Sequence, residues 1–189
     1  MSRQRNDSAG IVLGHTVSGR TLTTVGRFAS SRSHLEEALA LYDPISHRLL
    51  GHQVGFHPHI NSQALLGNTL FCLGFPDQAL ANSNAAIAEA RRLAHPPSLC
   101  QSLAFGTILL SLIGDNTALS ERADQLVAVA SEQGFPQWRA HGTIYRGWVK
   151  VKNGDVTEGM SLLRSGSAAY ATADFAVLLA GACEIAGQN

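Results

Sequence analysis

The chain has 189 residues, with 14 basic and 14 acidic side chains and a formal net charge of zero. Hydrophobic residues make up 45% of it and charged residues 15%, which is too apolar for a disordered chain. The balanced charge provides no general attraction to nucleic acid or to an anionic membrane. A chain of this length is expected to form one domain that buries roughly 70% of its unfolded surface.

The beginning of the sequence is polar, and residues 1–9 are expected to form a frayed tail before a single helical domain over residues 10–189. The tail has no apolar stretch of the kind found in a secretory signal. The most apolar segment, residues 103–113, is too short for a membrane span and is interrupted by polar and small residues. Three widely separated cysteines are expected to be reduced core residues, and the compartment to be the cytoplasm: Cys72, Cys100 and Cys183.

Four glycines recur with spacings of 48, 40 and 40 residues: Gly26, Gly74, Gly114 and Gly154. Each ends one apolar segment and precedes another, as a glycine in the left-handed conformation does at a helix C-terminus. Seven residues before each lies a small residue: Gly19, Gly67, Thr107 and Gly147. A glycine inside a helix costs about 1 kcal/mol relative to alanine, so close approach of a second helix is expected there. This periodicity is typical of a helix–turn–helix repeat.

Apolar residues at a period of 3.6 predict helices on both sides of each turn, and no segment alternates as a strand would. Prolines where a first helical turn would begin support the starts of four of them: Pro58, Pro76, Pro97 and Pro136. In chain order the expected helices cover 10–25, 28–42, 59–73, 76–94, 97–113, 117–133, 137–153, 156–170 and 173–186.

These helices group into repeats at about 10–43, 58–95, 97–134 and 136–171, followed by an end helix over 173–186. We therefore predict an all-α fold, a superhelical stack of four helical hairpins plus a final helix. The second repeat resembles a tetratricopeptide repeat (TPR) most clearly, through Gly67, Gly74, Ala79 and Ala86. The other repeats depart from that pattern, and the period of 40 instead of 34 implies a divergent member with longer helices.

Longer strings of the sequence resemble one bacterial group: residues 26–44, 73–81 and 132–136. They are similar to the C-terminal repeat region of large signalling proteins, in which a class III nucleotide cyclase module and an AAA-type ATPase module precede the repeats. The resemblance covers about residues 10–175. It implies a regulatory or protein-interaction role, and the chain is then either a free-standing repeat domain or a piece of a former multidomain gene.

No catalytic constellation is recognised in the sequence, so no enzyme is expected. It has no Gly-x-x-x-x-Gly-Lys-[Ser/Thr] or Gly-x-Ser-x-Gly motif, and the adjacent carboxylates Glu36 and Glu37 do not face each other on a helix. The connection over residues 43–57 and the following helix start raise a zinc hypothesis, through His47, His52, His57 and His59. Their spacing matches no ligand pattern, so we predict a surface loop without metal or cofactor.

The first helices of stacked hairpins line a concave face, where such solenoids hold a partner segment. Polar amides on these otherwise apolar helices cost little only when they face water or a ligand, and they hydrogen-bond well to an extended peptide. The alternative is that these amides brace a neighbouring helix and that the tryptophan belongs to the core. The predicted partner-binding residues are Arg20, Asn61, Asn68, Phe71, Gln101, His141, Trp148 and Lys152.

The end helix is almost wholly apolar, so it is expected to be buried, either against the fourth repeat or across a homodimer interface. The leading hypothesis is a non-catalytic module that binds a protein or peptide. The alternatives are a sensor that encloses a small molecule and a self-assembling scaffold. Basic residues are scattered, which excludes a stripe for tracking phosphates.

Overall fold

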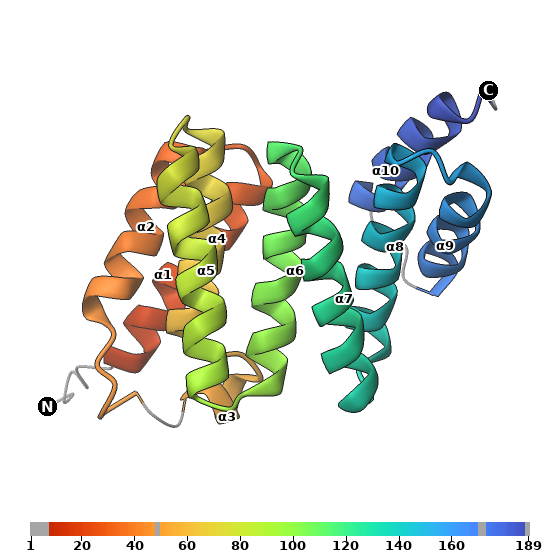
Figure 1. The fold of residues 1–189 in the computed structure, drawn as a ribbon. Helices are drawn as coiled ribbons and strands as arrows, with labels where there is room; N and C mark the ends of the chain where they lie inside the picture. Colours follow the sequence, from red (N-terminus) through yellow and green to blue (C-terminus); the bar gives the residue numbers. More distant parts are fainter. Residues whose placement is uncertain (1–7, 48–49, 170–172, 188–189) are drawn as a thin grey trace, which may run out of the picture. The chain divides into compact units, whose positions relative to one another are not determined.

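The computed structural model describes residues 8–47, 50–169 and 173–187, apart from the side chains of His52 and of residues 173–175. Residues 1–7 of the predicted tail and Tyr170 therefore lie outside the described part. Within it the chain forms α-helices and no strand (Figure 1), as the periodicity predicts. The helices are α1 (Ser8–Thr24), α2 (Phe28–Leu41), α3 (Leu50–Val54), α4 (Pro58–Cys72), α5 (Pro76–Arg92), α6 (Pro96–Ile113), α7 (Asn116–Glu132), α8 (Pro136–Lys152), α9 (Val156–Ala169) and α10 (Ala173–Ile185).

The helix boundaries agree with those expected to within two residues, and the structure adds one short helix. Helix α1 begins at Ser8, so the last two residues of the predicted tail are helical. Helix α6 begins at Pro96 rather than at the following proline. The short helix α3 lies in the segment that was expected to be an irregular loop.

The chain divides into two compact units, Met1–Phe105 and Gly106–Asn189, with the boundary inside α6. In the first unit α1 packs on α2 and α4 packs on α5, while α4 also contacts α1 and α2. Its core includes Ile60, Ala64, Ala86 and Ala90, against which Leu93, Leu99 and Phe105 pack. The small side chains at these positions let α4 and α5 approach closely.

In the second unit α8 lies between α7 and α9, and α10 packs against both α8 and α9. Each helix turns an apolar stripe inward, at the 3.6-residue period read from the sequence. The most deeply buried side chains of this unit include Leu119, Leu126, Ile144, Val151 and Leu163.

The four repeat glycines adopt the left-handed conformation predicted for them, with φ of 76°, 86°, 84° and 93° at Gly26, Gly74, Gly114 and Gly154. The turn after α5 departs from this rule, because its left-handed residue is Ala94, with φ of 47°. A side chain in this conformation is strained by about 1–2 kcal/mol.

The close helix approach predicted at the small residues is also confirmed. A Cβ added to Gly147 of α8 would lie 2.7 Å from the carbonyl oxygen of Gly159 in α9. A Cβ on Gly159 would in turn lie 2.7 Å from the carbonyl oxygen of Gly147. The two backbones therefore meet at a pair of facing glycines, which explains why each helix tolerates one.

The cysteines do not share one environment. Cys100 is buried, and its burial raises the pKa of its thiol to about 11. Cys72 is exposed, so the expectation that all three are core residues is wrong for this position. Cys72 is the last residue of α4, and its side chain is exposed at that end of the helix.

Helix α6 is more apolar than the sequence analysis recognised. Its 18 residues are long and apolar enough to cross a membrane, judged by length and composition alone. In the structure 56% of that window is buried inside the chain, as in the core helix of a helical repeat. The apolar segment is therefore longer than residues 103–113, the stretch that was expected to be too short for a membrane span.

Candidate functional site

Helix α4 is the most buried of the first helices, and hydroxyl pairs fix it to α1. The Thr16 and Ser62 hydroxyl oxygens lie 2.9 Å apart, and those of Thr23 and Thr69 lie 3.1 Å apart. The Ser31 hydroxyl of α2 donates to the carbonyl oxygen of Gly19, 2.8 Å away. These bonds satisfy polar groups inside the unit and fix the register between the helices.

Two amides on α4 are buried without being fully satisfied. Asn61 is 2% exposed and Asn68 is 8% exposed. Among the described residues, Asn61 Nδ2 and Asn68 Oδ1 have no hydrogen-bond partner. The side chains are seven residues apart, so they lie on one face of the helix, two turns from each other. One unpartnered atom is a donor and the other is an acceptor.

The other predicted binding residues of the first unit are placed differently. Arg20 is exposed on α1, Phe71 is half-buried near the end of α4, and Gln101 is buried on α6 with 9% exposure. Arg20 is thus exposed to solvent, whereas Gln101 is buried to about the same degree as Asn68.

In the second unit His141 is integrated into the fold. Its Nε2 lies 3.0 Å from the Thr107 hydroxyl, and its ring lies 5.0 Å from the Tyr145 ring. Trp138 contacts the same imidazole at 6.3 Å. His141 is only 7% exposed.

Trp148 lies against the end helix. A Cβ on Gly181 of α10 would approach Trp148 Cη2 to 3.3 Å, and Ala182 beside it is fully buried. Lys152 is exposed and places its Nζ 5.5 Å from the Trp148 ring centroid, as in a cation–π contact. These contacts agree with the alternative in which Trp148 belongs to the core and does not contact a partner. The binding roles of all eight residues stay predictions.

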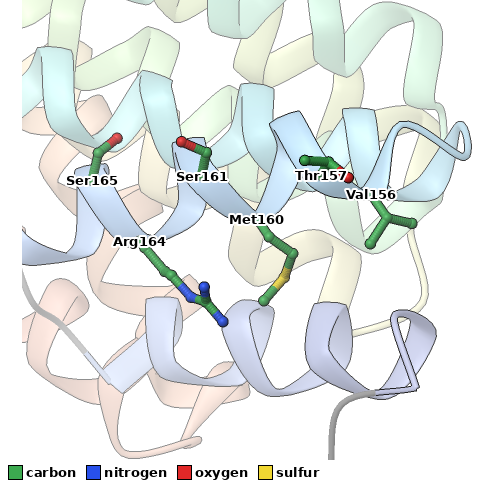
Figure 2. Close-up of a pocket in the computed structure, with 6 residues that line it drawn as sticks. All are labelled: Val156, Thr157, Met160, Ser161, Arg164 and Ser165. Atoms are coloured by element: carbon green, nitrogen blue, oxygen red, sulfur yellow. The ribbon is translucent and has the colours of Figure 1, made fainter.

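The outer face of α9 carries an open hollow of about 580 Å³. Figure 2 shows Met160 and Arg164 pointing from α9 towards α10, with Ser161 and Ser165 on the other edge of the helix. The described residues that line it include no imidazole, carboxylate or thiol: Val156, Thr157, Met160, Ser161, Arg164 and Ser165. These lining side chains therefore include no imidazole or carboxylate that could act as a general base.

A second cavity of about 440 Å³ lies in the first unit, between α2, the connection that contains α3, α4 and the end of α5. Unlike the α9 hollow, it is lined by imidazoles, a phenol and an ion pair, and sequence reasoning did not find it. Its lining consists of Tyr42, Pro44, Gly51, His57, His59, Glu89, Arg92, Leu93, Ala94 and His95. This set is called the histidine cavity below.

Tyr42 connects the histidines of the connection. Its hydroxyl oxygen lies 3.1 Å from His57 Nε2, and its ring lies 5.0 Å from that of His59. His47, 2% exposed, accepts the backbone N–H of Asp43 at Nδ1 and lies 3.0 Å from the Ser8 hydroxyl at Nε2. The connection is exposed at residues 43–46 and 53–55, as expected of a surface loop, but the imidazoles of His47 and His57 pack inward on the Tyr42 ring. His52 lies outside the described side chains.

The charges in the histidine cavity are arranged as one ion pair beside buried imidazoles. Arg92 donates from Nε and Nη2 to the two carboxylate oxygens of Glu89, each at 2.7 Å, and this lowers the pKa of Glu89. Burial lowers the pKa of His59 and raises that of Tyr42. Among the described residues no group of three histidines, cysteines or carboxylates is placed to hold a metal ion.

The histidine cavity could not be read from spacing because its walls come from distant segments. The pair of histidines around Pro58 was the available signal. Nothing in the sequence shows that Tyr42, Glu89 and His95 meet that pair, since they come from the residue after α2, the last turn of α5 and the residue before α6.

No family model matches the sequence, and no curated protein matches it. Among solved structures, the chain is similar to the nearly identical TPR-like repeats of a kinesin light chain-like protein from Podosopora anserina. That likeness covers 98% of this chain and 90% of the other, with 16% identity and a TM-score of 0.65. A point variant of the same protein matches over 94% of this chain and 87% of the other, with 18% identity and a TM-score of 0.64. The likeness shows the fold, a TPR-like helical solenoid, as predicted.

Proposed function

We propose that this TPR-like chain is a non-catalytic module that binds an extended segment of a partner protein, with Asn61 and Asn68 of α4 as the central contacts. TPR-like repeats generally mediate protein–protein interaction, which supports this class of function. The observation that carries the proposal is the pair of unpartnered amide atoms on one buried face of α4.

The energetic argument concerns the cost of leaving these atoms unpaired. A buried polar group without a hydrogen bond costs about 1–3 kcal/mol, so most buried polar groups have partners. Neighbouring hydroxyls such as Thr69 and Ser62 do have partners inside the unit. The two unpartnered amide atoms share one face of α4, which supports a partner from outside the chain.

The geometry of the pair suits a peptide backbone. Seven residues of α-helix span about 10 Å, and about three residues of extended chain cover the same distance. Asn61 Nδ2 would donate to a backbone carbonyl oxygen, and Asn68 Oδ1 would accept a backbone N–H about three residues away. Backbone recognition of this kind binds an extended segment with little dependence on its side chains.

Charge supports a protein partner rather than a nucleic acid. In the described part of the chain, several basic side chains are already paired with acids: Arg32 with Glu36, Arg92 with Glu89, Arg146 with Asp124, and Lys150 with Asp155 and Glu158. With a formal net charge of zero and basic residues scattered along the chain, no cationic surface is concentrated for counterion release from a phosphate backbone. We place the module in the cytoplasm, acting in signalling next to a bacterial cyclase or ATPase module. That context rests on the sequence resemblance.

The test is selection of peptides from a random library on the purified chain, followed by affinity measurement with variants. Asn61→Ala and Asn68→Ala should each weaken a selected peptide about tenfold, which corresponds to about 1.4 kcal/mol. Asn84→Ala, a matched change at an exposed position of α5, should leave affinity within twofold. If Asn61→Ala, Asn68→Ala and Arg20→Ala all bind the peptide as tightly as Asn84→Ala does, the proposal is overturned.

Self-assembly through α10 is a second candidate, because that helix is buried on one side only. Ala182 is fully buried against the fourth repeat, whereas Val177 is 73% exposed and Ile185 is 47% exposed. Light scattering on the intact chain and on Val177→Glu decides it. A dimer that the substitution dissociates would support self-assembly, and a monomer at every concentration would exclude it.

A further inference from the structure

The histidine cavity has the composition of a ligand site, independent of the amide pair on α4. Its volume of about 440 Å³ is within the roughly 300–1,000 Å³ range of small-molecule pockets. Its wall is apolar at Pro44, Leu93 and Ala94, and polar at the imidazoles and at Arg92. A closed hydrophobic core would not gather this many hydrogen-bonding side chains around open space.

The hydrogen bonds of His95 fix which of its nitrogens carries the proton. The backbone N–H of Ser98 donates to His95 Nδ1 over 3.3 Å, and the Ser98 hydroxyl lies 2.9 Å from the same nitrogen. That hydroxyl oxygen accepts the backbone N–H of His57, so it can donate its own proton to His95. Because Nδ1 is the acceptor, the neutral ring carries its proton on Nε2 and is an N–H donor there.

His59 presents a donor for a related reason. Its Nδ1 is buried and has no partner among the described residues. A buried N–H without an acceptor is rarer and costlier than an unpaired acceptor, so the proton belongs on Nε2. The Tyr42 ring packs beside this imidazole at 5.0 Å and limits its rotation.

Arg92 adds the cationic group. Its Nε and Nη2 are used in the paired contact with Glu89, which also cancels the carboxylate charge in the cavity. Nη1 keeps its two N–H groups for another acceptor. The polar lining therefore offers several N–H donors, while its carboxylate is already engaged.

We propose that the histidine cavity binds a small molecule bearing an oxyanion, a carboxylate or a phosphate, held by His59 Nε2 and Arg92 Nη1, with His95 in the same cavity wall. Carboxylate and phosphate oxygens are the natural acceptors for a guanidinium and an imidazole N–H group. The apolar wall accommodates the rest of the molecule. Binding here would give the repeat module a means of sensing a small molecule.

The experiment is a nuclear magnetic resonance titration of the intact 15N-labelled chain, in which the histidine ring resonances are followed. The two probes are inorganic phosphate and benzoate. A saturable shift confined to His59, His95 and their neighbours supports the site. Tighter binding of benzoate identifies a carboxylate on an apolar body, and tighter binding of phosphate identifies a phosphate ester.

Matched variants locate the contact. Arg92→Gln and His59→Leu should each weaken the better probe by at least about tenfold. Arg91→Gln makes the same change one residue earlier on α5, outside the cavity lining, and should change affinity less than twofold, as should His34→Leu on α2. Absence of a saturable shift with either probe in the wild-type chain overturns the proposal. So does equal weakening by Arg91→Gln and Arg92→Gln.

Discussion

Gly67 of α4 lies so close to Ala79 of α5 that a Cβ on the glycine would be 2.9 Å from the alanine carbonyl oxygen. The same added Cβ would lie 3.3 Å from the backbone nitrogen of Ser83. Both obstacles belong to a helix backbone, which cannot move aside as a flexible side chain can. The contact joins the two helices of the second repeat, and Gly147 in the fourth repeat meets the backbone of α9 in the same way.

Gly67→Ala should therefore destabilise the chain, although alanine is the better helix former. Overpacking costs about 1–3 kcal/mol, which exceeds the roughly 1 kcal/mol gained in helix propensity. Gly14→Ala is the matched control, because a Cβ at Gly14 in α1 meets nothing within 4 Å. Urea unfolding should show a lower midpoint for the first variant and a higher one for the second. Stabilisation by both would contradict the close approach.

Ala94→Gly should stabilise the chain. The φ of 47° at Ala94 strains a residue with a side chain by about 1–2 kcal/mol, and glycine relieves this strain at some cost in unfolded-state entropy. The reverse substitution at an equivalent turn, Gly74→Ala, should be destabilising by a similar amount, since Gly74 has φ of 86°. Thermal unfolding monitored by circular dichroism measures both. A fall in melting temperature for Ala94→Gly would show that this turn is not strained.

Asn61→Leu distinguishes binding from bracing. If the amide braces α4, its loss lowers stability; if its partner is a ligand, removing an unsatisfied buried group raises stability in the free chain. We expect an increase of about 1 kcal/mol, or about 2–4 °C in melting temperature for a chain of this size. The same variant should lose affinity for the selected peptide. Lower stability would assign Asn61 a structural role.

The lowered pKa of His59 predicts that the folded chain loses stability at acidic pH. Burial holds its pKa in the folded chain below its usual 6.5, so as pH falls the unfolded chain binds the proton first. The free energy that neutral His59 contributes to folding is constant above about pH 6.5. It is lost progressively as pH falls from about 6.5 through the lower pKa of the folded chain. Urea unfolding at pH 7.5 and pH 5 should show that the free energy of unfolding falls less for His59→Gln than for the wild type. Parallel losses in the two proteins would contradict the assignment.

The repeat architecture could be predicted because local rules determine it. Glycines in the left-handed conformation end the helices, prolines begin them, and the apolar period marks their buried faces. The placement of Asn61 and Asn68 on one face follows from helix periodicity in the same way. Their lack of partners does not, because it depends on what the neighbouring helices bring near them.

The sequence by itself was sufficient for the all-α class, the four hairpins and the glycine contacts, since each depends on residues close together along the chain. Tertiary structure alone decided the environment of the histidines, the exposure of Cys72 and the packing of Trp148 under α10. Tyr42, His59 and Glu89 form one cavity because helices separated by a turn or a long connection are brought together by burial of apolar surface. That force has no direction along the chain, so residue spacing carries no record of which polar groups it brings into contact.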